Sequence, residues 1–242
     1  GSGEAVDLRD GGVRLGGYDV SRAVEAVNAE IAPALRGKDA RDQAAIDQAM
    51  IALDGTGNKG RLGGNAIVAT SMAVLHAAAA ASRIPLWQYL AGGNKVRIPL
   101  PEIQIFGGGA HAARRVDIQD FMVMCPGARS FAQALEWTAE VYLAAGAIMK
   151  QAGKLQGVAD EGGYWPAFRS NEEALDTLVE AISKAGFRAG EQVAISLDVA
   201  ASEFGARGAY TLALDNRKLG TDELIAMLGR WLDTYPIVSV ED

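Results

Sequence analysis

Two stretches of the sequence decide the fold: QVAISLD at residues 192–198 and IVSVED at residues 237–242. Each is a short apolar run that ends in a carboxylate, Asp198 in the first stretch and Glu241 in the second. Residues 221–234, which lie between them, have the pattern of an amphipathic helix. A buried strand, a helix and a second buried strand together predict a βαβ unit with parallel neighbouring strands.

The same alternation of apolar runs and amphipathic segments extends back to about residue 97. It predicts an α/β fold over residues 97–242, with a parallel sheet and crossover helices. The two long helices before residue 190 each begin with the serine of a capping-box pattern. The predicted elements are strands at 97–106, 121–124, 192–197 and 237–240, and helices at 130–151, 170–185 and 221–234.

Residues 1–96 have a different texture, with helical patterns joined by glycine-rich loops. Helices are predicted at residues 21–35, 42–53 and 65–82. The last of these is apolar on nearly all sides, which predicts that it is buried on most of them. We therefore divide the chain into a mostly helical domain at 1–96 and an α/β domain at 97–242.

Composition excludes several classes of protein. With 49% hydrophobic and 22% charged residues, the 242-residue chain has a globular balance rather than that of a disordered protein. The net charge of −7 argues against nucleic acid as a partner. Cys125 is the only cysteine, which fits a reducing compartment. The most apolar stretch, residues 66–81, is shorter than the ~20 residues of a membrane helix, so no membrane partner is expected.

Asp198 and Glu241 occupy equivalent positions at strand ends. In a βα barrel the carboxyl ends of the strands meet at the mouth that holds the active site. Carboxylates gathered there are hard oxygen ligands of the kind that Mg²⁺ prefers. A single acidic residue after a strand is more often a helix cap or a solvated loop residue, so both interpretations stay open at this point.

Two further clusters are candidates for chemistry. Asp160 and Glu161 are adjacent carboxylates followed by two glycines, in a loop between predicted helices. Such a pair suits acid–base work when its pKa values are separated, although a solvated turn has the same pattern. The glycines at 107–109 allow close approach to a ligand, and His111 follows them as a contact or proton carrier.

Taken in order, several strings along essentially the whole chain resemble enolase, the phosphopyruvate hydratase of glycolysis. No single string is decisive, but the ordered set is specific. The strings are EAVDLRDG at 4–11, IAPAL at 31–35, LDGT with NK at 53–59, GGAHA at 108–112, DEGG at 160–163, LDVAASEF at 197–204 and YPIVSVED at 235–242.

The resemblance implies an enolase-type, TIM-like βα barrel, incomplete here, after the mostly helical part of an α+β capping domain. It implies a Mg²⁺-dependent lyase that interconverts 2-phosphoglycerate, a small phosphorylated anion, with phosphoenolpyruvate and water. It also implies a cytoplasmic homodimer or larger homo-oligomer. The residues carried over are Asp198 and Glu241 as two of three metal ligands, Glu161 as general acid supported by Asp160, and His111, Asp120 and Glu241 as substrate contacts.

Some positions depart from the family pattern. Asp120 stands where the family has a glutamate, and Gly107 where it usually has asparagine. Arg114 and Arg115 follow the histidine, where small or amide residues are common. These differences suit an enolase-like paralogue acting on a related acid such as phosphonopyruvate, but the two arginines are equally compatible with surface charges.

The resemblance also predicts that the chain is cut at both ends. Residues 1–4 resemble the last part of the family's mobile active-site loop. The third metal ligand and the lysine base of the family lie beyond Asp242. A complete TIM barrel needs about 250 residues, many more than residues 97–242 supply. A non-catalytic protein that keeps the fold is therefore a third interpretation.

Overall fold

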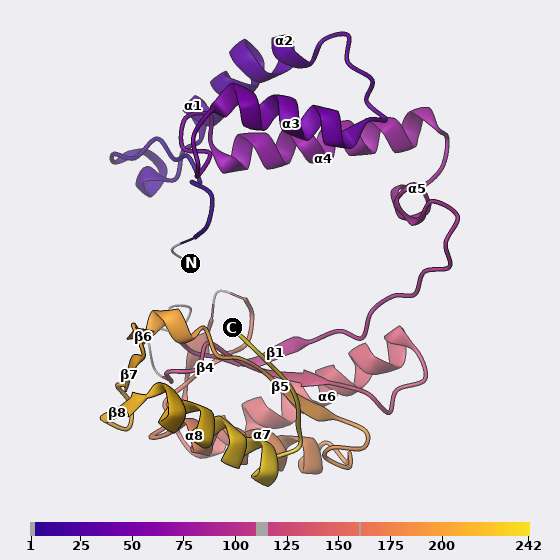
Figure 1. Ribbon diagram of the computed structural model, residues 1–242. Helices are drawn as coiled ribbons and strands as arrows, with labels where there is room; N and C mark the ends of the chain where they lie inside the picture. Colours follow the sequence, from indigo (N-terminus) through magenta and orange to yellow (C-terminus); the bar gives the residue numbers. More distant parts are fainter. Residues whose placement is uncertain (1–2, 110–115, 160) are drawn as a thin grey trace. The chain divides into compact units, whose positions relative to one another are not determined.

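A computed structural model describes residues 3–109, 116–159 and 161–242 (Figure 1). The chain forms two compact units, Gly1–Arg97 and Ile98–Asp242, and each is described here by itself. The division between the two units lies one residue from the domain boundary that the sequence predicts.

The first unit is helical, as expected. Residues 21–35 form one helical run, in which the wide turns of a π-helical segment come just before Pro33. Proline has no N–H to donate to the preceding turn, which accounts for the irregular hydrogen bonding there. The elements are a 3-10 turn Arg14–Gly17, α1 Ser21–Ala26, the π segment Val27–Ile31, α2 Ala32–Leu35, α3 Gln43–Asp54, α4 Gly64–Ala81 and α5 Leu86–Ala91.

Helices α3 and α4 lie side by side and enclose a small core (Figure 1). Ile46 and Met50 of α3 are buried in it together with Leu62. The α3 helix ends at Asp54, whose buried carboxylate accepts hydrogen bonds from the backbone N–H groups of Thr56 and Leu62 at 2.9 and 2.8 Å. Asp54 therefore ties the loop after α3 to the core.

Helix α4 differs from the prediction in two respects, its length and its burial. It has 18 residues and a mean hydropathy of 1.4, so by length and composition alone it could cross a membrane. Only 28% of it is buried, so the prediction that it is covered on most sides is wrong for the part of the chain described here. Its apolar character comes largely from alanine, which has little side-chain area to bury. The core helix of a soluble protein can pass the same length and composition criteria.

The second unit is built on a six-stranded sheet in the order β3-β4-β1-β2-β5-β9. The helices α6 Phe131–Gln151, α7 Asn171–Lys184 and α8 Thr221–Thr234 lie along one face of this sheet (Figure 1). A small second sheet is formed by β6 Gly205–Ala206, β7 Ala209–Leu212 and β8 Arg217–Gly220. The main strands are β1 Ile103–Gly107, β2 Asp120–Met124, β3 Leu155–Val158, β4 Tyr164–Pro166, β5 Ala194–Asp198 and β9 Ile237–Glu241.

The strand directions only partly agree with the prediction. Strands β5 and β9 are parallel, which confirms the βαβ unit, and β1 and β4 are also parallel. Strand β2, however, is antiparallel to both of its neighbours, β1 and β5, so an all-parallel sheet is wrong. Parallel neighbours need a crossover, usually a helix, and the described residues between β1 and β2 form none.

Short or interrupted strands account for the other differences. The strand expected at 97–106 begins only at Ile103, because Pro99 and Pro101 cannot donate ladder hydrogen bonds. The hairpin of β3 and β4 and the small sheet of β6–β8 were not predicted at all. Their strands have only two to four residues, too few to show a clear period of two.

The two faces of the main sheet differ in chemistry. Phe121 and Val123 of β2 and Leu197 of β5 belong to the core beneath the helices. Because side chains alternate along a strand, Asp120 and Asp198 point to the opposite face. The helices therefore cover the apolar face and leave the carboxylates on the other.

Gly146 in α6 gives a first prediction about stability. A Cβ at this position would lie 2.6 Å from Cζ of Tyr164, whose ring stacks on Tyr142 with centroids 4.1 Å apart. We expect Gly146→Ala to lower the free energy of unfolding, because overpacking costs about 1–3 kcal/mol and exceeds the helix-propensity gain of up to ~1 kcal/mol. The matched control is Gly229→Ala in α8, which has nothing within 4 Å and should stabilise the protein slightly.

Urea or thermal unfolding of both variants beside the unchanged protein measures the two effects. Equal midpoints for the two variants would show that the ring of Tyr164 moves aside at little cost.

Candidate functional site

Residues from four adjacent strands form a single row across the main sheet. Gly107 pairs with Asp120, Asp120 with Asp198, and Asp198 with Glu241. Residues paired in this way share a face of the sheet. The register therefore brings together three carboxylates that the sequence singled out, Asp120, Asp198 and Glu241.

Asp198 is half-buried at the centre of this row. Burial raises the pKa of its carboxyl group, and the negative charges of Asp120, Glu241 and Asp242 raise it further. Two hydrogen bonds support the ionised form: Gln119 Nε2 donates to Oδ2 at 2.8 Å, and the Ala200 N–H donates to Oδ1 at 3.1 Å. The row is thus a concentration of negative charge that a cation would relieve.

The donor set of the row fits a divalent cation of the Mg²⁺ type. All of its charged groups are hard oxygen donors, and Asp198 and Glu241 are neighbours on parallel strands. No group of three His, Cys, Asp or Glu side chains within residues 3–109, 116–159 and 161–242 has the geometry to hold a metal ion. Asp198 and Glu241 therefore fit as part of a ligand set, as the family resemblance implies.

Asp120 is almost fully buried, with 4% of its surface exposed. Gln104 Nε2 donates a hydrogen bond to its Oδ1, and Gln119 Nε2 lies 3.4 Å from its Oδ2. Gln104 is on β1, paired with Met122, so it shares the face of Asp120. Two amide side chains thus hold this carboxylate in place.

Glu161 lies in a turn between β3 and β4, where the sequence analysis expected a loop between helices. The turn is closed by hydrogen bonds from Ala159 N to Gly163 O at 2.7 Å and from Gly162 N to Ala159 O at 3.0 Å. Glu161 is exposed, and its Oε2 accepts a hydrogen bond from Gln104 Nε2 at 3.3 Å. The same amide therefore contacts both Glu161 and Asp120. Asp160, its predicted support, lies outside the described residues.

The glycines at the end of β1 and directly after it pack against the protein itself. A Cβ at Gly107 would collide with Cβ of Ala159, and one at Gly108 would lie 2.5 Å from Cγ2 of Val116. The chain's own packing thus accounts for these two glycines. His111, Arg114 and Arg115 lie outside the described residues, so their predicted roles stay predictions.

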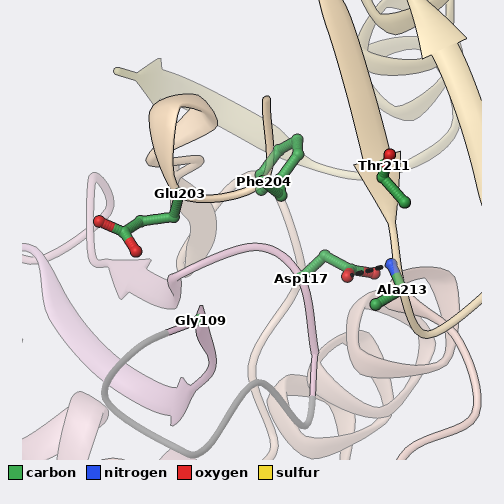
Figure 2. A pocket seen from close by; sticks show the side chains of 6 residues that line it. All are labelled: Gly109, Asp117, Glu203, Phe204, Thr211 and Ala213. Carbon is green, nitrogen blue, oxygen red and sulfur yellow. Dashed lines mark hydrogen bonds between the residues drawn. The ribbon is translucent and has the colours of Figure 1, made fainter. Parts of the chain in front are cut away.

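A pocket of about 280 Å³ adjoins this segment (Figure 2). The residues that line it are Gly109, Asp117, Glu203, Phe204, Thr211 and Ala213. Asp117 is buried and accepts a hydrogen bond from Ala213 N at 2.7 Å (Figure 2). It also accepts one from Asn171 Nδ2 at 3.1 Å. Those bonds give Asp117 a structural role, because its carboxylate is bound to the protein's own donors.

Sequence reasoning did not single out Gln104 as a site residue. A signal was present, because Gln104 is a polar residue between Ile103 and Ile105 in an otherwise apolar strand. Its partners are 16 and 57 residues away in the sequence, so no local motif points to them.

Comparison with known proteins agrees with this architecture. The family model "Enolase, N-terminal domain" matches residues 1–90, and "Enolase, C-terminal TIM barrel domain" matches residues 95–242. "Enolase 1" of Desulfitobacterium hafniense (strain Y51) is 48% identical over 242 residues, which are 99% of this chain and 55% of the relative. The chain thus spans about half the length of this relative.

These matches cover nearly the whole chain and agree with the mixed α/β sheet of the second unit. They confirm the predicted fold class, a part of a TIM-like barrel that follows the mostly helical part of an N-terminal domain. The chain belongs to the enolase family.

Proposed function

We propose that the whole protein is a Mg²⁺-dependent hydro-lyase that interconverts 2-phosphoglycerate with phosphoenolpyruvate and water. The observation that carries this proposal is the row of Asp120, Asp198 and Glu241, with Glu161 joined to it through Gln104. The family membership and the name of the relative, "Enolase 1", support the same reaction.

Asp198 and Glu241 would hold the cation. When bound, Mg²⁺ offsets the negative charge that develops on the substrate carboxylate as the adjacent carbon loses its proton. The hydrogen bonds from Gln119 and Ala200 fix the orientation of the Asp198 carboxylate before any ligand arrives. Such pre-organisation spares the site a rearrangement during the reaction.

Glu161 is the proposed general acid. In the dehydration direction its carboxyl group gives a proton to the departing hydroxyl oxygen, which leaves as water. Glu161 lies between the two backbone hydrogen bonds that join Ala159 to Gly162 and Gly163, and its side chain is exposed. The proposed roles of Asp160 as support, and of His111 and Asp120 as substrate contacts, rest on the family resemblance.

Removal of metal is the direct test. We expect the full-length protein, once treated with EDTA, to lose turnover of 2-phosphoglycerate and to regain it when Mg²⁺ is added back in excess. The ultraviolet absorbance of the phosphoenolpyruvate double bond follows the reaction. Full turnover after chelation would contradict the role of the metal, and no turnover in either direction with Mg²⁺ present would contradict the proposed reaction.

A second candidate function is the same type of reaction on a related acid such as phosphonopyruvate. The observation that favours it is the position of Asp120, a short carboxylate that Gln104 holds beside Gly107, where no side chain fits. A substrate panel decides between them: a larger kcat/KM for phosphonopyruvate than for phosphoenolpyruvate would favour the second candidate. Binding of Mg²⁺ without turnover of any acid would favour a non-catalytic role.

We also propose that the whole protein is a cytoplasmic homodimer or larger homo-oligomer. Family membership supports this, and the single buried Cys125 is compatible with a reducing compartment. Light scattering on the purified full-length protein measures the number of subunits.

A further inference from the structure

We propose that Gln104 is a positioning residue that ties the turn carrying Glu161 to Asp120, so that the two carboxylates meet the substrate as one unit. This inference rests on the proposed function, because it gives Gln104 a task in that same site. The three side chains come from three separate segments: β1, the start of β2 and the turn between β3 and β4.

The orientation of the Gln104 amide follows from its partners. The N–H of Gly163 can only donate, and it lies 2.7 Å from one end of the amide, so that end is the oxygen. The opposite end is therefore the NH₂ group, which has two hydrogens to donate. Its neighbours are Oδ1 of Asp120 and Oε2 of Glu161, both acceptors when ionised. All the polar atoms of the amide are thus engaged.

Gln104 is buried, with 8% of its surface exposed, and two glycines leave room for its side chain. A Cβ at Gly163 would lie 2.7 Å from Cγ of Gln104, and one at Gly107 would lie 3.2 Å from Nε2. A side chain at Gly163 would collide with Gln104, and one at Gly107 would press against the amide as well as collide with Ala159. Gly107 and Asp120, two departures from the family pattern, are therefore parts of one arrangement whose centre is Gln104.

Side-chain length explains why a glutamine faces an aspartate. Gln104 pairs with Met122, so Asp120 is its diagonal neighbour on β2. Diagonal neighbours in a sheet are about 7–8 Å apart at Cα, a span that only long side chains bridge. Asparagine at 104 would fall one methylene short of Asp120, and glutamate at 120 would restore that methylene.

The test compares four variants of the full-length protein. Gln104→Glu keeps the volume and the acceptor for Gly163 N–H but replaces the donor by a negative charge. Gln104→Asn shortens the side chain at 104 by one methylene. The double variant Gln104→Asn with Asp120→Glu adds that methylene to the side chain at 120 instead. The matched control is Gln133→Glu, because Gln133 Oε1 likewise accepts a backbone N–H, that of Arg129, at 2.7 Å, but at the start of α6.

The expected result for Gln104→Glu and Gln104→Asn is a fall in kcat of about 10–100-fold with KM changed less than about threefold. The double variant should recover most of the loss of Gln104→Asn, and Gln133→Glu should leave kcat unchanged. An unchanged kcat in both Gln104 variants would overturn the proposal. The proposal would also be overturned if the double variant did not recover the kcat lost in Gln104→Asn and if that loss accompanied a fall in the unfolding midpoint.

A second measurement does not depend on turnover. Hydrogen–deuterium exchange of the segment 159–166 should be faster in Gln104→Leu, which cannot bind the Gly163 N–H, than in the unchanged protein. Unchanged exchange would overturn the proposed link between Gln104 and the turn, even if the enzyme is active. If the unchanged protein turns over none of the acids tested, the proposed function fails, while faster exchange in Gln104→Leu still supports that link.

Discussion

Replacement of Asp198 by asparagine is expected to lower kcat/KM of the full-length protein by about 10²–10³-fold. Asparagine keeps the shape of the side chain and an oxygen for the Ala200 N–H, but it removes the negative charge next to Glu241. The electrostatic contribution of a bound divalent ion is several kcal/mol, and each 1.4 kcal/mol corresponds to a tenfold change in rate. The loss should come with weaker Mg²⁺ binding, measured by calorimetry.

The metal-free variant should be at least as stable as the unchanged protein. Asp198 is opposed by the charges of Asp120, Glu241 and Asp242, so removing its charge removes a repulsion. This separates a binding defect from a folding defect. Wild-type Mg²⁺ affinity and turnover in Asp198→Asn would contradict the assignment of Asp198 as a ligand.

Asp215→Asn is the matched control for this substitution. Asp215 is also a partly buried aspartate of the second unit, and burial likewise raises the pKa of its carboxyl group. It lies outside the carboxylate row, between β7 and β8, with Arg217 at 3.7 Å. Asp215→Asn should therefore leave both turnover and Mg²⁺ binding unchanged.

The βαβ unit whose strands end at Asp198 and Glu241 was predictable because neighbouring residues in the sequence define each of its elements. Continuous apolar runs mark buried strands, and the amphipathic helix between them makes the strands parallel. The direction of β2 was not predictable from such runs, because an apolar strand looks the same in either direction. The described residues between β1 and β2 form no helix, which agrees with the antiparallel pair.

The candidate site was predictable to the extent that its residues end strands. Asp198 and Glu241 were found in this way, and the register confirms that they are neighbours. The link between Glu161 and Asp120 depends instead on Gln104, and an irregularity of register between Gln104 and Phe106 places Gly107 rather than Phe106 opposite Asp120. Nothing in the sequence marks that irregularity, and the hairpin that carries Glu161 has strands too short to detect.

Replacement of Glu161 by glutamine should lower kcat for dehydration by about 10²–10⁴-fold, the usual contribution of a general acid. Glutamine has nearly the same volume and can still accept the hydrogen bond from Gln104 Nε2 through its side-chain oxygen. The turn between β3 and β4 should therefore keep its conformation. The matched control is Glu191→Gln, an exposed glutamate whose surface ion pair with Arg188 is remote from the carboxylate row; it should leave kcat unchanged.

A second measurement on Glu161→Gln distinguishes protonation of the departing hydroxyl from removal of the proton next to the substrate carboxylate. Removal of the proton next to the substrate carboxylate does not require the group that protonates the departing hydroxyl. In deuterated water, 2-phosphoglycerate should therefore still exchange this proton for deuterium in Glu161→Gln, although phosphoenolpyruvate forms slowly. Loss of both exchange and dehydration would assign Glu161 to binding rather than to proton donation, whereas full dehydration would remove it from the chemistry altogether. Exchange without dehydration is the outcome expected of a general acid fixed on a turn and tied to Asp120 by Gln104.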